Sequence, residues 1–126
     1  MTAESPHGFS DLIGLDFTDV EAGYSRGTIE VSDELMNPNG VLHGGVLYTL
    51  ADSGMGAALY AELAEDQQCA TIEIKINYLK PVRTGRVTCE TTLEKNGRTV
   101  AYLESELVND GKTVARATGS FSIFTP

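Results

Sequence analysis

The residues best suited to chemistry in this sequence lie between Asn37 and Asp52. Within this stretch, His43-Gly44-Gly45 stands where a turn-rich segment passes into an apolar, helix-like one. The first amides of a helix have no partner within the helix and carry partial positive charge, and glycine lets a ligand oxygen approach them without meeting a Cβ. A site that stabilises an oxyanion needs these properties. A helix entry with a plain capping role is the alternative interpretation.

Asp52 is the second candidate, because it stands in the middle of the apolar segment. Burying an unpaired carboxylate is costly, so a structural aspartate here would need donors such as Ser53 or Thr49. The other interpretation is a carboxylate kept in a dry cleft as a general base or nucleophile, where desolvation raises its basicity. We favour the second interpretation, since ionisable groups in such surroundings are typical of functional sites.

The segment that carries Asp52 has the pattern of a helix. Its apolar and small residues fill almost every face of a 3.6-residue period: Val46, Leu47, Leu50, Ala51, Gly54, Met55, Ala57, Ala58 and Ala61. A helix that is apolar nearly all round must be buried nearly all round. The small residues in its middle predict that other backbone packs closely against it.

The remaining segments predict a sheet around that helix. Residues 15–31 alternate and are interrupted by Ala22-Gly23, which predicts two strands joined by a turn. After residue 66, Ile72, Ile74, Ile76 and Tyr78 alternate with Thr71, Glu73, Lys75 and Asn77. Runs near 87–93, 98–108 and 113–124 follow with short connections, which predicts an antiparallel meander. We expect residues 1–126 to form a single α+β domain, with a curved antiparallel sheet of roughly five to six strands wrapped around one long central helix.

Helix geometry separates the two candidate groups. Gly44 and Asp52 are eight residues apart, which places them about 12 Å apart along the axis at ~1.5 Å per residue. One reacting carbonyl cannot easily contact both groups in the same chain. The wrapped sheet also leaves part of one helix flank and a strand edge without a partner. We therefore expect two copies to pair with antiparallel helices, so that Gly44 of one copy approaches Asp52 of the other.

Charge excludes one class of partner. The net charge is −9, and residues 1–74 carry thirteen acidic residues against one basic residue, Arg26. Because nucleic-acid binding needs a basic footprint, we expect no nucleic-acid partner. Six of the nine basic residues lie between Lys75 and Arg98. This local cluster suits a small polyanionic ligand, and a solvated strand surface is the alternative.

We also expect a cytoplasmic protein without a cofactor or a membrane partner. Residues 1–10 lack the basic start and apolar run of a signal peptide, and the apolar stretch 46–60 is too short and interrupted to span a bilayer. Cys69 and Cys89 make no disulfide framework, and two histidines, His7 and His43, would need an unusual ligand set to bind zinc. We expect both thiols to be small buried side chains.

One run of residues resembles a known family. Asn37, then His43-Gly44-Gly45, six residues and Asp52, followed by Asn77-Tyr-Leu-Lys-Pro81 and Gly85, is similar to the hotdog-fold thioesterases of the phenylacetate-pathway (PaaI-like) group. The match extends over essentially the whole chain and includes the closing strand 115–121. The resemblance implies the hotdog fold, hydrolysis of an acyl-coenzyme A (acyl-CoA) thioester to carboxylic acid and coenzyme A, and a homodimer or homotetramer with composite active sites.

The resemblance also implies roles for five catalytic residues. Asp52 is the carboxylate that activates water or attacks the thioester carbon, and the Gly44 amide polarises the carbonyl. Asn37 positions the water or the carbonyl, and His43 shapes the loop near the thioester. Thr71 stands where the family often has a hydroxyl that assists the water. Thr71 also begins the polar face of its predicted strand, so an outward, structural role is the alternative.

Three further residues are implied on the substrate-binding side. Gly45 belongs to the same glycine pair at the start of the helix. Lys80 and Arg83 are our choices for contacting the phosphates of coenzyme A, which would explain the basic cluster.

Two other functions stay open. One is a non-catalytic acyl-CoA-binding protein, since a fold alone does not settle function. Asp52 counts against it, because a pure binder gains little from a buried carboxylate. The other is a hotdog hydratase or dehydratase, although His43 and Asp52, nine residues apart, do not reproduce the paired histidine and acid of those enzymes. Aromatic, short-chain and medium-chain acyl groups are all compatible with the sequence.

Overall fold

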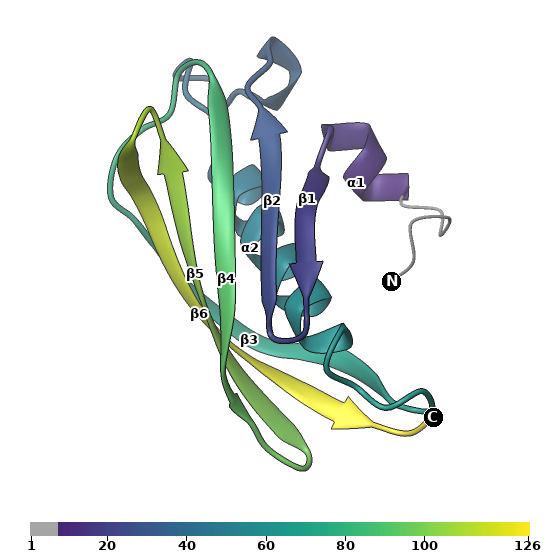
Figure 1. The fold of residues 1–126 in the computed structure, drawn as a ribbon. Helices are drawn as coiled ribbons and strands as arrows, with labels where there is room; N and C mark the ends of the chain where they lie inside the picture. The colour runs from purple at the N-terminus through teal and green to yellow at the C-terminus, as the bar shows by residue number, and fades with distance from the viewer. Residues whose placement is uncertain (1–7) are drawn as a thin grey trace.

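A curved antiparallel sheet and one long helix dominate the computed structural model, which describes residues 8–126 (Figure 1). In chain order the elements are α1 (Gly8–Ile13), β1 (Asp16–Glu21), β2 (Tyr24–Glu30), the 3₁₀ turn η1 (Asp33–Leu35), α2 (Gly44–Tyr60), β3 (Gln68–Tyr78), β4 (Arg86–Asn96), β5 (Val100–Asn109) and β6 (Lys112–Phe124). The sheet has six strands and curls around α2. The predicted α+β hotdog fold is confirmed.

The order of the strands differs from the predicted meander. The sheet runs β1-β2-β4-β5-β6-β3, so β1 and β2 form one hairpin, β4, β5 and β6 follow one another as hairpins, and β3 is the strand out of chain order. β3 pairs with β6, and β4 pairs with β2. Tight turns fix which strands are neighbours, but the connection 79–85 is no tight turn and carries the chain across β6 and β5. β1 and β3 are therefore the two edges of the sheet.

The buried side of α2 forms the centre of the core. Leu50, Ala51, Met55, Ala58 and Leu59 have no exposed surface. They lie among buried apolar side chains of the sheet: Ile29, Val87, Leu103, Leu107, Ala115 and Phe121. Burial of each of the larger side chains among them, such as Leu50 or Phe121, stabilises the folded state by about 1.5–3 kcal/mol. This packing fixes the rotation of α2 and hence the directions of the groups on its other side.

Gly54 lets the middle of α2 touch the sheet, as the sequence predicts. A Cβ at this position would lie 2.8 Å from Oγ1 of Thr91. The Ser25 hydroxyl donates to the Gly54 carbonyl at 2.7 Å, and Thr91 and Ser105 share a hydrogen bond of 2.7 Å beside the buried Cys89. The Ser25 hydroxyl thus ties the helix to β2, and the hydrogen bond between Thr91 and Ser105 joins β4 to β5 beneath it.

The expectation that α2 is buried nearly all round is wrong. Tyr48 and Tyr60 are 36% and 47% exposed, and Asp52 and Gly56 are half-buried. These four residues, spaced by four along the helix, define what we call the open flank. Among residues 8–126 the sheet covers only one side of the helix, and the open flank stays partly exposed.

A β-bulge changes the orientation of β3. The pairing with β6 shifts between Thr71 and Glu73, so Ile72 is an extra residue in the ladder. Thr71 pairs with Phe121 and Ile74 pairs with Gly119, and both partners are buried. Thr71 therefore shares the helix-facing side with Ile74, although simple alternation predicts the opposite.

The two cysteines and the helices of residues 8–126 can be compared with the expectations from the sequence. Cys89 is buried and Cys69 is half-buried, and both are free thiols. No helix within residues 8–126 is long and apolar enough to cross a bilayer. Residues 1–7, with His7 and most of the stretch compared with a signal peptide, lie outside the described residues.

Candidate active site

The entry to α2 is built around His43, the N-cap residue. Its Nδ1 accepts a hydrogen bond of 2.8 Å from the Gly45 amide, and its carbonyl accepts one of 2.9 Å from the Val46 amide. A Cβ at Gly45 would lie 2.9 Å from Nδ1, so the contact requires glycine. The Gly45 amide is thus occupied by the cap, and a substrate could use this predicted binding group only by displacing His43.

The Gly44 amide is oriented away from the helix. The N–H and C=O of a trans peptide point in opposite directions, and the His43 carbonyl of the same peptide points along the helix to Val46. Within residues 8–126 no group accepts a hydrogen bond from this amide. It combines an unused donor with the positive end of the helix dipole, which suits a negatively charged or polarised oxygen.

Tyr78 closes over this helix entry from the end of β3. Its hydroxyl donates to the Gly44 carbonyl at 2.8 Å, and a Cβ at Gly44 would lie 3.1 Å from the tyrosine ring. Burial, followed by the neighbouring Tyr48, raises the pKa of Tyr78, so the hydroxyl stays protonated as a donor. The sequence-based roles did not include Tyr78; its only signal was its place in the Asn77–Pro81 motif.

A cavity of about 300 Å³ adjoins the Gly44 side of the helix entry. Its lining includes three predicted site residues, Asn37, Gly44 and Lys80, together with Tyr78. The Asn37 side-chain oxygen accepts hydrogen bonds from the amides of Asn39 and Val41 at 2.9 and 3.3 Å, which shapes the loop. Among the described residues its Nδ2 makes no hydrogen bond and is free to donate to an occupant.

Asp52 and Thr71 form a second group farther along the helix. The Thr71 hydroxyl donates to Asp52 Oδ1 at 2.7 Å. The bulge at Ile72 makes this contact possible, so the Thr71 side chain is directed to the helix and not outward. Thr49, one of the donors considered for Asp52, instead bonds the Gly45 carbonyl at 2.9 Å. Among residues 8–126 the other carboxylate oxygen of Asp52 accepts no hydrogen bond.

The predicted site residues therefore fall into separate groups within one chain. Asn37, Gly44 and Lys80 line the cavity at the helix entry, whereas Asp52 does not. Arg83 lies elsewhere, in a cavity of about 510 Å³ that also includes Arg86.

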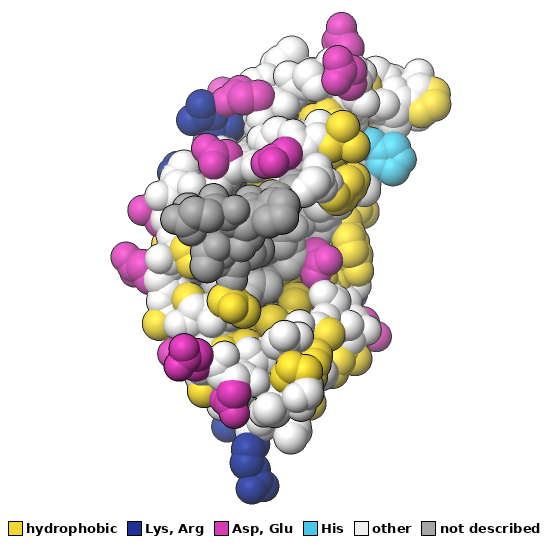
Figure 2. All heavy atoms as spheres, turned by 90° about the vertical axis from the view of Figure 1, so that its right-hand side faces the viewer, with side chains coloured by type: hydrophobic (Ala, Val, Ile, Leu, Met, Phe, Trp, Pro, Cys, Tyr) yellow, Lys and Arg dark blue, Asp and Glu magenta, His cyan; other side chains and the backbone are white. Residues whose placement is uncertain are grey.

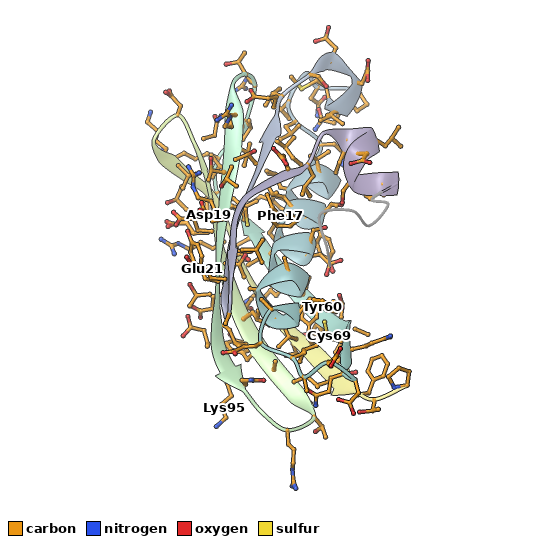
Figure 3. The ribbon with its side chains drawn as sticks, turned by 45° about the vertical axis from the view of Figure 1, so that its right-hand side comes forward. Phe17, Asp19, Glu21, Tyr60, Cys69 and Lys95 are labelled. Carbon is orange, nitrogen blue, oxygen red and sulfur yellow. The ribbon has the colours of Figure 1, made fainter. Side chains whose placement is uncertain are left out.

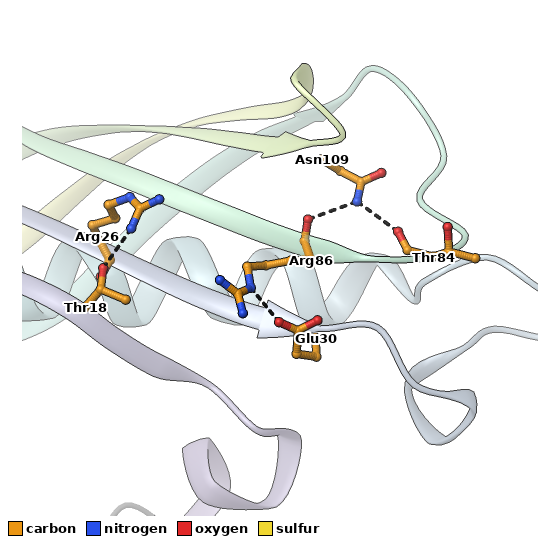
Figure 4. A network of polar contacts seen from close by, with 6 residues as sticks. All are labelled: Thr18, Arg26, Glu30, Thr84, Arg86 and Asn109. Atoms are coloured by element: carbon orange, nitrogen blue, oxygen red, sulfur yellow. Dashed lines mark hydrogen bonds and ion pairs between the residues drawn. The ribbon is translucent and has the colours of Figure 1, made fainter.

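Three residues that line the same cavity as Arg83, namely Thr84, Arg86 and Asn109, are connected by hydrogen bonds (Figure 4). Arg86 forms an ion pair with Glu30, and Asn109 Nδ2 donates to the carbonyls of Thr84 and Arg86, at 3.0 Å each. Arg83 itself makes no ion pair within the described residues and remains available to an anion.

An apolar surface runs beside Asp52. Ile72 is 57% exposed on the edge strand β3 and directly follows Thr71, whose hydroxyl contacts Asp52 of the open flank. Figure 2 shows hydrophobic side chains gathered along one side of this face, with acidic ones more to the other side. Tyr60 and Cys69 lie together at the far end of the helix (Figure 3). Within residues 8–126 the outer edge of β3 has no strand partner.

Comparison with known proteins identifies the family. The model of the thioesterase superfamily matches residues 39–115, which span the helix entry, α2 and most of the sheet. The chain belongs to the thioesterase superfamily. A solved structure of the thioesterase HI1161 from Haemophilus influenzae is 26% identical, with a TM-score of 0.89, and the alignment covers 98% of this chain and 85% of that one.

Two further relatives refine the picture. The PaaI protein of the E. coli phenylacetic acid degradation operon shares the fold with a TM-score of 0.87 at 23% identity, over 94% of this chain and 85% of that one. A 1,4-dihydroxy-2-naphthoyl-CoA hydrolase from Listeria monocytogenes is 26% identical over 103 residues, covering 82% of this chain and 84% of the relative. The resemblance to hotdog thioesterases is confirmed, and the family supports thioester hydrolysis as the reaction class.

Proposed function

We propose that this thioesterase hydrolyses an acyl-CoA thioester at composite sites built by two copies of the chain. The single observation that carries the proposal is the position of two incompletely bonded groups on one helix. The Gly44 amide lacks an acceptor within the described residues, and Asp52 retains an unused oxygen eight residues farther on. The distance along the axis, about 12 Å, is too long for one carbonyl to contact both.

Pairing two copies through a two-fold axis resolves this separation. The open flank of α2 and the unpaired edge of β3 lie next to each other and are partly apolar, with Tyr48, Tyr60 and Ile72 exposed. In an antiparallel pair of helices, the start of one lies beside the middle of the other. A two-fold interface repeats each contact, so a dimer has two identical sites. A homotetramer would be a pair of such dimers.

In the proposed reaction, Asp52 acts as a general base on water. The water oxygen attacks the thioester carbon and transfers a proton to the free oxygen of Asp52, while Thr71 holds the other oxygen. The Gly44 amide donates to the oxyanion that forms. The intermediate then collapses, the carbon–sulfur bond breaks, and the coenzyme A sulfur takes the proton. Asn37, through its free Nδ2, positions the carbonyl or the water.

Three features support acyl-CoA as the substrate class. The Listeria relative is named as a hydrolase of an aromatic acyl-CoA. Lys80 lines the cavity beside Gly44, and Arg83 lines the next one, so both can receive phosphate groups from the same extended ligand. The cavity at the helix entry, about 300 Å³, is of the size of a small-molecule site.

A thiol-release assay over a panel of aromatic and aliphatic acyl-CoAs tests the proposal. We expect wild type to release coenzyme A, and Asp52→Asn to lower kcat by about 10²–10⁴-fold because the base is lost. Asp19→Asn is the matched control, since Asp19 is exposed on the edge strand β1 (Figure 3). Binding without thiol release would identify a non-catalytic binder, and an enoyl product would identify a lyase; either outcome refutes the proposal.

A further inference from the structure

The peptide between Gly44 and Gly45 is hydrogen-bonded at both of its polar groups. The Tyr78 hydroxyl donates to its carbonyl oxygen at 2.8 Å, and its N–H donates to His43 Nδ1 at the same distance. The preceding peptide is fixed as well, because the His43 carbonyl accepts from the Val46 amide. The two peptide planes meet at the Cα of Gly44, so together they set the direction of the Gly44 N–H.

Glycine makes this fixation necessary. A residue without a Cβ has access to many more backbone conformations than any other, so a Gly-Gly pair at a helix entry is intrinsically soft. A donor stabilises an oxyanion well only if it already points at the developing charge and does not have to reorganise. The direction of the Gly44 amide therefore needs a restraint from outside the Gly-Gly pair. Tyr78 provides this restraint through its hydrogen bond to the Gly44 carbonyl.

The packing shows why residue 44 must be glycine. A Cβ there would lie 3.1–3.2 Å from three atoms of Tyr78, Cζ, Cε1 and Oη. The ring occupies the space that a side chain at 44 would take. The absence of a Cβ thus admits Tyr78, in addition to the approach of a ligand that the sequence suggests.

Tyr78 is itself firmly placed. It ends β3 and pairs with Ala115 of β6, and the amides of the next two residues, Leu79 and Lys80, both donate to the Val114 carbonyl at 2.8 and 3.1 Å. Its ring also lines the cavity beside Gly44. The side chain is thus carried by the sheet, so that it connects a rigid strand to the start of α2.

We propose that Tyr78 is a positioning residue for the oxyanion donor, acting through its hydrogen bond to the Gly44 carbonyl. The inference rests on the proposed role of Gly44 in thioester hydrolysis. It differs from a substrate-binding role, because the hydroxyl is used on the protein backbone and acts on the reaction only through the direction of the Gly44 amide.

The variant Tyr78→Phe tests this, since it keeps the ring against Gly44 and removes only the hydroxyl. We expect kcat for the best acyl-CoA of the panel to fall about tenfold, because a misdirected donor loses part of its effect, while KM changes less than about twofold. In the same variant, amide hydrogen exchange at Gly45 should become about fivefold faster, as expected for loss of one hydrogen bond in the restraint. Tyr102→Phe, on the other face of the sheet and 40% exposed, is the matched control and should change neither quantity.

The outcomes separate the two proposals. An unchanged kcat, or a higher KM with unchanged kcat, overturns the positioning role of Tyr78 in an active enzyme. If wild type releases no thiol from any acyl-CoA, the proposed function fails, and with it the catalytic part of this inference. In that case the exchange rate at Gly45 still decides whether Tyr78 restrains the peptide, and an unchanged rate overturns that as well.

Discussion

The two sides of α2 differ in how completely their polar groups are bonded. On the buried side, every buried side-chain nitrogen and oxygen of the described residues has a partner, as Ser25 does on the Gly54 carbonyl. On the open flank, Asp52 receives one hydrogen bond from Thr71, and at the helix entry the Gly44 amide has no acceptor within residues 8–126. The polar groups that hold the helix in place therefore all have hydrogen-bond partners. The groups that we assign to the substrate keep a free donor or a free acceptor.

Subunit mixing tests most directly whether the Gly44 amide of one copy and Asp52 of the other act in one active site. Asp52→Asn and Gly44→Ala should each be nearly inactive alone, the second because a Cβ would both obstruct the approach of the substrate oxygen to the amide and displace Tyr78. Refolded together in equal amounts, about half of the dimers would be mixed, and each mixed dimer would hold one intact site. We expect thiol release to recover to about a quarter of the wild-type rate. A mixture no more active than the average of its parts would place each site within one chain.

The two helix glycines provide a matched test of the two sides. In Gly54→Ala the new Cβ would lie 2.8 Å from Thr91 Oγ1, so we expect the free energy of unfolding to fall by about 1–3 kcal/mol through overpacking. At Gly56, on the open flank, nothing lies within 4 Å of an added Cβ. In a monomeric chain, where no partner helix lies on the open flank, Gly56→Ala should instead raise the unfolding free energy by about 0.5–1 kcal/mol through helix propensity. Urea denaturation measures both, and equal effects would contradict the difference in packing.

The pH dependence of the free energy of unfolding tests only the buried side of α2, through Cys89. Burial raises the pKa of Cys89 to about 11 from 9.0, because the thiolate is disfavoured there. The unfolded chain therefore loses this proton first, and the stability contributed by the neutral thiol is complete below pH 9 and is lost as pH rises toward 11. Between pH 8 and 10.5, wild type should lose about 1–2 kcal/mol more unfolding free energy than Cys89→Ala. Parallel pH profiles of the two proteins would show that Cys89 titrates normally.

The smallest effect is expected on the open flank, at Thr71. Thr71→Val keeps the shape and removes the donor to Asp52 Oδ1, so we expect kcat to fall about fivefold, the value of one ordinary hydrogen bond. Thr71→Ser retains the hydroxyl and should stay close to wild type. Steady-state thiol release measures both variants. Similar activity of Val and Ser at this position would show that the hydrogen bond does not orient the carboxylate.

The elements and the fold class were predictable because periodicity is a local property. The alternation along β4, β5 and β6 follows directly from how their side chains are buried, whereas the apolar pattern of α2 predicted the helix but not its open flank. The pairing of β3 with β6 was not predictable in this way, because Pro81 and Gly85 indicate a turn but do not show whether the strands before and after it are neighbours. Cytoplasmic location and the acyl-CoA substrate stay predictions.

The site was predictable in its residue types more than in its contacts. Asp52 and Gly44 stood out because a carboxylate within an apolar helix and a glycine at its start are unusual in themselves. The contact between Thr71 and Asp52 depends on the bulge at Ile72, which an alternating sequence does not reveal. The bond from Tyr78 to the Gly44 carbonyl depends on which strand ends beside the helix entry, a tertiary property.

The extra residue in β3 has a consequence for how this strand can change in length. Because Ile72 has no partner in β6, its loss would leave an unbroken ladder and a fully paired strand. The half of the strand before it would keep its register, because Thr71 would still pair with Phe121 and Glu73 with Ser120, so Cys69 and Thr71 would keep their present face. A one-residue deletion at Ile72 would thus preserve both the sheet and the hydrogen bond from Thr71 to Asp52.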